Sequence, residues 1–193
     1  MAYEPKTWLT TGSGGTADGD PQADPDASFG KYRASTEVSL TIGNLWTNLS
    51  LAQLASSTTY RCVCATNNNI TDVLEECRLM SADLSTLISG MSVEFGAAAF
   101  DDTTAFESIA DEDTSPVSVT LATPFDSTGT PNTDWGSALK LGPLNGYLNS
   151  ADITADEDTR IFIFIELTCL AVDANAFDGS NNKFGIRVVG ADA

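Results

Sequence analysis

Histidine is absent from this 193-residue sequence. Its absence removes the commonest general acid–base group, the commonest metal ligand and the base partner of serine and cysteine nucleophiles. The absence of histidine does not exclude enzymes whose catalytic groups are carboxylates or lysine. We predict that the protein is not an enzyme and that it holds no cofactor.

Basic residues are scarce, because nine Lys and Arg stand against 27 Asp and Glu and give a net charge of -18. Affinity for nucleic acid comes largely from Lys and Arg that displace counterions from phosphates. Anionic membrane surfaces also attract basic segments. The charge balance therefore predicts that neither nucleic acid nor a membrane is the partner.

Long apolar runs are missing as well. The longest, Ile161 to Ile165, has the length of a strand, well short of the roughly 18 apolar residues that a membrane helix needs. The first residues, MAYEPK, have neither the basic nor the apolar region of a signal peptide. These features predict a protein that is made in a cytoplasm.

The four cysteines are Cys62, Cys64, Cys77 and Cys169. Cys62 and Cys64 are two residues apart in an expected strand, so both point to one face and are badly placed to bond each other. The set lacks the paired C-x-x-C spacing that is typical of a zinc site with four thiolates. We expect four reduced, half-buried thiols and no metal.

Alternating apolar and polar residues predict strands near 36–43, 60–65, 117–122 and 184–189, and a mainly apolar run predicts a strand at 160–170. The segment 160–170 is the strongest, with Ile161, Ile163 and Ile165 on one face and Phe162 and Phe164 on the other. We expect it to be central and covered on both sides. Residues 71–89 fit a helical stripe or two short strands, and the strands suit their neighbours better.

These segments predict an all-β fold, an antiparallel β-sandwich of about seven or eight strands that spans residues 36–193. The stretch 11–30, TGSGGTADGDPQADPDASFG, consists mainly of Gly, Asp, Pro and small residues without a period. Residues 1–35 are accordingly predicted to form an extended N-terminal arm that lies along another subunit, or else a floppy terminus.

Carboxylates cluster in three places, at residues 18–26, 111–113 and 156–158. Such clusters are able to hold calcium through oxygen ligands. None of them follows the spacing of a calcium-binding loop, since Asp18-Gly19-Asp20 runs into Pro21. Solvated loop charge is the better interpretation, and a calcium- or carbohydrate-binding module is kept as a further alternative.

Several stretches taken in order resemble a loosely defined group of small virion structural proteins of tailed bacteriophages. They include ADPDASFG at 23–30, TYRCV at 59–63 before an Asn-rich turn, SIADEDTSPVSVTLATP at 108–124, LGPLNG at 141–146 and the final segment 162–193. Nothing in residues 71–100 aligns with that group. The resemblance implies a virion protein that assembles on the major capsid protein or other virion subunits, as a homo-oligomer for which a trimer is favoured.

The first functional hypothesis is a capsid decoration (cement) protein that docks on the outside of the head and stabilises it. The alternative is a tail, baseplate or fibre-attachment subunit. Aromatic side chains are typical anchors at protein interfaces, and the predicted subunit-interface residues are Trp8, Phe29, Tyr32, Trp46 and Trp135.

Overall fold

The computed structural model describes residues 5–11, 32–37, 45–46, 49–67, 74–82, 87–97, 109–117, 119–122, 139–144, 160–175 and 185–191. These residues are mainly strands that pair antiparallel, joined by one helix of five residues, α1 (Leu51–Ala55). The strand-rich, antiparallel class predicted from the sequence is confirmed. In this part of the chain no helix has the length and apolar character required to cross a bilayer.

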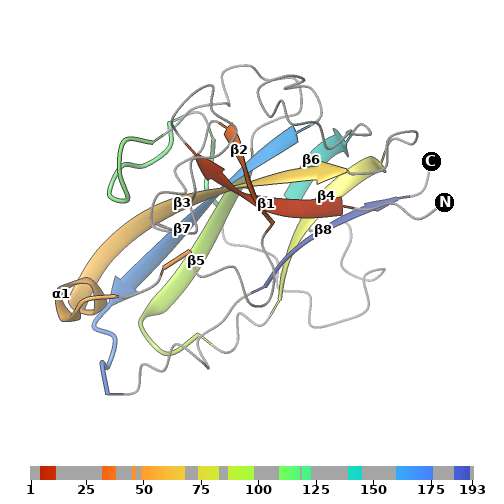
Figure 1. Cartoon of the computed structure of the whole chain (residues 1–193). Coiled ribbons are helices and arrows are strands. Elements are labelled where there is room, and N and C mark those ends of the chain that lie inside the picture. The colour runs from red at the N-terminus through yellow and green to blue at the C-terminus, as the bar shows by residue number, and fades with distance from the viewer. Residues whose placement is uncertain are drawn as a thin grey trace.

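Five strands form one antiparallel sheet in the order β2-β1-β3-β7-β5 (Figure 1). Their bounds are β1 Pro5–Thr11, β2 Tyr32–Glu37, β3 Ser56–Asn67, β5 Met91–Ala97 and β7 Arg160–Leu170. β3 and β7 pair from Ser56 opposite Leu170 to Thr66 opposite Arg160. β5 lies on the other side of β7. The segment 160–170 is therefore a central strand, as its composition predicted.

A second antiparallel sheet has the order β6-β4-β8. Its strands are β4 (Leu74–Ala82), β6 (Leu139–Leu144) and β8 (Gly185–Ala191). β4 resolves the ambiguous stretch 71–89 in favour of a strand over residues 74–82, and β8 confirms the strand expected near 184–189. Gly142 and Pro143 belong to β6, which is an edge strand, where a proline costs no ladder hydrogen bond.

The two faces of the five-stranded sheet bury two separate sets of apolar side chains. Odd-numbered residues of β3, β5 and β7 belong to the first core, which also takes in Cys77 and Leu79 of β4. Even-numbered residues of β3 and β7 belong to the second core, with Trp8 of β1. The first core consists of Leu45, Leu54, Val63, Ala65, Cys77, Leu79, Val93, Phe95, Ile161, Ile163, Ile165, Leu167, Cys169 and Val172. The second consists of Trp8, Tyr60, Cys62, Cys64, Ile109, Phe162 and Phe164.

The second core is covered by residues 109–117 and 119–122, here named the crossing segment. Its first part lies at the edge of β3, where the amide of Tyr60 donates to the carbonyl of Glu112 at 2.8 Å. Its last part lies at the edge of β5, where Phe95 and Ala122 exchange two backbone hydrogen bonds. The prediction of a strand at 117–122 is wrong, because this segment passes over the sheet and forms an isolated bridge at Ala122.

Gly96 of β5 permits the close approach of the crossing segment. A Cβ atom at this position would lie 2.8 Å from the carbonyl oxygen of Thr120 and 3.1 Å from Val119. Val119 and Leu121 pack against the second core. The missing side chain lets the backbone of the segment lie directly on the strand.

The N-terminal residues differ from the predicted arm in the parts that the structure describes. β1 pairs with β2 on one side and with β3 on the other, so residues 5–11 and 32–37 belong to the sheet. The Oγ1 of Thr10 donates to the carbonyl of Cys62 at 2.8 Å, and Pro5 occupies the first strand position, which tolerates proline. Residues 12–31 lie outside the described residues.

Candidate functional site

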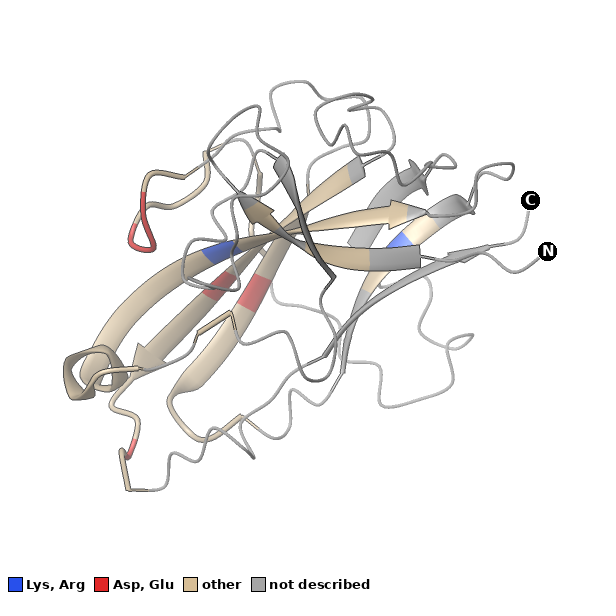
Figure 2. Ribbon diagram, viewed as in Figure 1, with Lys and Arg blue, Asp and Glu red and all other residues tan. Residues whose placement is uncertain are grey.

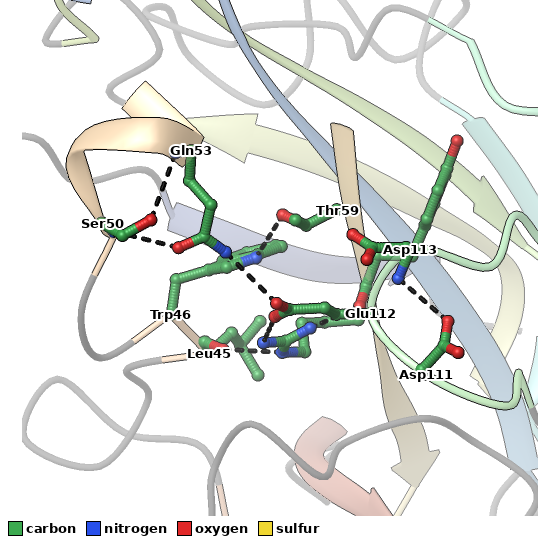
Figure 3. Close-up of polar contacts among 10 residues, drawn as sticks. Leu45, Trp46, Ser50, Gln53, Thr59, Asp111, Glu112 and Asp113 are labelled. Atoms are coloured by element: carbon green, nitrogen blue, oxygen red, sulfur yellow. Dashed lines mark hydrogen bonds and ion pairs between the residues drawn. The ribbon is translucent and has the colours of Figure 1, made fainter. Parts of the chain in front are cut away.

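Among the residues that the structure describes, the most connected polar cluster lies where α1, β3 and the crossing segment meet (Figure 3). α1 is a single turn that a capping box holds in place. The Oγ of Ser50 accepts from the amide of Gln53, and the side chain of Gln53 accepts from the amide of Ser50 at 2.9 Å. This reciprocal cap satisfies amides that a short helix leaves without partners. It also fixes the direction in which Gln53 points.

Arg61 is the centre of the cluster. Its side chain leaves β3 on the face of the first core and is 1% exposed. Nε donates to the carbonyl of Leu45 at 2.9 Å, and Nη1 donates to the carbonyl of Tyr60 at 2.8 Å. Nη2 donates to the Oε2 of Glu112 at 2.8 Å. All three guanidinium nitrogens thus bind within the chain, as a buried charge requires.

Glu112 reaches Arg61 from a tight turn of the crossing segment. The Oδ1 of Asp111 accepts from the amide of Asp113 at 3.1 Å and from the hydroxyl of Thr114 at 2.7 Å, which closes the turn. The other oxygen of Glu112, Oε1, accepts from the Nε2 of Gln53 at 3.2 Å. One carboxylate therefore joins the helix cap to the buried guanidinium.

Trp46 packs beside this ion pair. The guanidinium carbon of Arg61 lies 5.5 Å from the centroid of the indole ring, within the range of a cation–π interaction. The Nε1 of Trp46 donates to the Oγ1 of Thr59 at 2.8 Å. The indole ring of Trp46 and the guanidinium of Arg61 together hold residues 45–46 against β3. With each charge engaged inside the chain, this cluster acts as a structural junction between three segments.

A second polar group lies on the opposite face of the same strands. Tyr60 is opposite Glu166 in the register of β3 and β7, and Glu166 is opposite Glu94 of β5. Burial raises the pKa of Tyr60 above its ordinary value of 10.0, and Glu166 raises it further, whereas a hydrogen bond with Ser115 lowers it. Two carboxylates directly opposite each other repel. Both are half-buried, and they lie at the half of the sheet toward α1.

The predicted interface residues separate into three groups. Trp8 is 5% exposed and its Nε1 donates to the Oγ1 of Thr66 at 2.8 Å, so it packs in the second core and is not displayed as an anchor for another subunit. Trp46 is half-buried in the junction. Tyr32 begins β2. Phe29 and Trp135 lie outside the described residues.

The four cysteines are buried, and no two of them form a disulfide. Burial raises the pKa of the Cys169 thiol. Cys62 and Cys64 lie in the second core and Cys77 and Cys169 in the first, so the sheet separates the two pairs. They do not converge on one metal ion. Across the described ranges, no three Cys, Asp or Glu side chains gather in a way that would hold a metal.

No protein-family model, curated protein or solved structure matches this chain. The resemblance to virion proteins of tailed bacteriophages stays a prediction from sequence motifs.

The junction itself was missed in the sequence. The only signal for it is Arg61, a charged residue on the same side of β3 as Val63 and Ala65, in the middle of the TYRCV motif. A charge at a core position requires a partner. Nothing in the spacing points to Glu112, which is 51 positions away.

Proposed function

We propose that the protein is a virion structural protein of a tailed bacteriophage, and specifically a capsid decoration protein that docks on the outside of the head. In this proposal the two antiparallel sheets are the layers of a β-sandwich. Its partners are the major capsid protein or other virion subunits, and its working form is a homotrimer. The motifs at 23–30, 59–63, 141–146 and 162–193 support this assignment.

The observation that carries a docking role is the exposure of large apolar side chains on an otherwise acidic chain. Leu51 is 75% exposed and Leu170 is 60% exposed, and both lie at the same end of the five-stranded sheet. Single exposed apolar residues are ordinary, whereas neighbouring ones indicate an interaction surface. The buried junction beside them fixes α1, so this surface is held rigidly.

A decoration protein stabilises a shell by mass action. It binds the expanded lattice and not the precursor, so each docked copy shifts the equilibrium toward the expanded state. Acidic charge that faces outward keeps the particles dispersed. No bond is made or broken in this mechanism.

The test is co-sedimentation of the purified protein with expanded, decoration-free heads, with precursor heads and with isolated tails of the encoding phage. Binding to expanded heads alone, together with a trimeric mass in light scattering, is the expected result. Binding to tails alone would replace the proposal with the tail-subunit alternative. A protein that binds none of the three particles would remove the virion assignment.

A further inference from the structure

α1 and the end of β7 carry exposed apolar side chains at one end of the larger sheet. Figure 1 shows the helix beside the tip of the β7 arrow, at one end of the larger sheet. The contacts are direct, because the amide of Ala171 donates to the carbonyl of Ala55 and the amide of Val172 donates to that of Leu54, both at 2.9 Å. The exposed apolar residues, here named the apolar tip, are Leu51, Ala52, Ala55, Leu170 and Ala171.

The framework under the apolar tip is fixed. Leu54 and Val172 anchor it in the first core. The amide of Leu170 donates to the carbonyl of Gly90 at 2.7 Å, and the capping box holds the first turn of α1. A rigid surface loses little conformational entropy when it binds, which favours affinity.

Carboxylates flank the apolar tip on two sides. The 111–113 turn is tied to α1 through the bond from Gln53 to Glu112, and Asp173 follows directly after Val172. Asp111, Asp113 and Asp173 are exposed. Asp111 and Asp173 each accept hydrogen bonds within their own turns, so their directions are set. Figure 2 shows both acidic turns near α1.

No positive charge balances these carboxylates where side chains are described. The two basic side chains there, Arg61 and Arg78, are both buried, and Arg61 is already paired with Glu112. The whole chain carries a net charge of -18. A second copy of the apolar tip would bring the same carboxylates against each other, and like charges across an interface cost affinity.

We infer that the apolar tip inserts into an apolar pocket of a different protein whose rim carries Lys or Arg, and that it is not the contact between copies of this chain. The inference rests on the proposed function, since it names the surface by which the protein docks. Apolar side chains at the centre supply affinity, and the acidic flanks supply orientation and rate of association.

The first test compares the double variant Leu51→Asp/Leu170→Asp with Val117→Asp. Val117 is 92% exposed and lies in the crossing segment, so it is a matched apolar-to-acidic control. All three positions are exposed, and the variants should keep the wild-type circular dichroism spectrum and melting temperature. Affinity for expanded, decoration-free heads should fall about tenfold or more in the double variant and stay unchanged in Val117→Asp.

The second test removes the flanking charge with Asp111→Asn/Asp113→Asn/Asp173→Asn. Asparagine keeps the side-chain oxygen that closes each turn. Head binding by the wild type should weaken steeply between about 0.05 and about 0.5 M NaCl, and this dependence should flatten in the triple variant.

The outcomes separate the two proposals. If the wild type binds heads and the Leu51/Leu170 variant binds equally well, the docking surface is wrong although the function stands. If that variant loses self-association instead, the occupant is a second copy and the inference is overturned. If the wild type binds no heads, the proposed function itself is wrong, whatever the variants do.

Discussion

The guanidinium of Arg61, which is 1% exposed, meets the carboxylate of Glu112 at 2.8 Å, although 51 positions separate them in the chain. The carboxylate side chain is 34% exposed, so one partner is fully desolvated and the other only in part. The buried guanidinium dominates the contribution of the pair to stability. If Glu112 were removed, no water could solvate the charge of Arg61 in its place.

A double-mutant cycle measures this coupling. Arg61→Met should lower the free energy of unfolding by about 3 kcal/mol, because the carbonyls of Leu45 and Tyr60 lose their donor. Glu112→Gln should cost about 1 to 2 kcal/mol, less than a fully buried pair, since water screens the partly exposed carboxylate. The double variant should lose at least about 1 kcal/mol less than the sum.

Urea denaturation gives these values. The neighbouring Asp113→Asn is the control and should stay within about 0.5 kcal/mol of the wild type, because its exposed side chain lies outside the ion pair. Additive effects of the two variants would mean that the ion pair contributes nothing of its own.

Gly96→Ala should destabilise the protein by about 1 to 3 kcal/mol, because its Cβ would lie 2.8 Å from the carbonyl oxygen of Thr120. Thermal and urea unfolding should both show the loss. Ser92→Ala, an exposed position on the same face of β5, should change little. Wild-type stability in Gly96→Ala would show that the crossing segment does not lie against this strand.

Tyr60 should make stability decline at high pH. Its pKa is raised in the folded protein, chiefly by burial, so the unfolded chain releases the phenol proton first, near its ordinary value of 10.0. The contribution is complete below about pH 10 and is lost as the pH rises through the folded pKa. In Tyr60→Phe the free energy of unfolding should fall less between about pH 9 and about pH 11. Parallel pH profiles of the two proteins would contradict this.

Deletion of residues 1–11 should abolish cooperative unfolding or lower its midpoint sharply. It removes β1, which pairs with both β2 and β3, and it takes Trp8 from the second core. Trp8→Phe should cost about 1 kcal/mol or more, because it removes the bond to Thr66 and leaves the core imperfectly filled. An unchanged midpoint after the deletion would restore the interpretation of this segment as an arm.

The sequence predicted the fold best where the residue pattern of a single strand is enough to show which of its faces are buried. Ile161, Ile163 and Ile165 alternate with Phe162 and Phe164, and each set is buried in a different core. A strand with two apolar faces must be buried on both sides, so its own sequence is enough to predict that it is central. For the same reason Cys62 and Cys64 were correctly placed on one face of β3.

The sequence predicted poorly where the outcome depended on distant partners. Thr10 and Trp8 in β1 make their hydrogen bonds with Cys62 and Thr66 of β3, which no local pattern reveals. Val119 and Leu121 alternate as a strand would, yet they cover the second core without strand pairing apart from the bridge at Ala122. Trp8, which the sequence predicts as a docking anchor, is buried in the second core.

The pairing of β3 with β7 also determines at which stage of its synthesis the chain is able to fold. Thr58 and Thr168, whose hydroxyls lie 3.1 Å apart, are separated by 110 positions. A ribosome must therefore deliver most of the chain before the middle of the larger sheet is closed, and such long-range closure is slow. Until β7 is made, β3 and β5 lack the strand that lies between them in the folded sheet. Newly made chains should depend on chaperones during that interval, and the yield of folded protein should fall when synthesis is faster than chaperone binding.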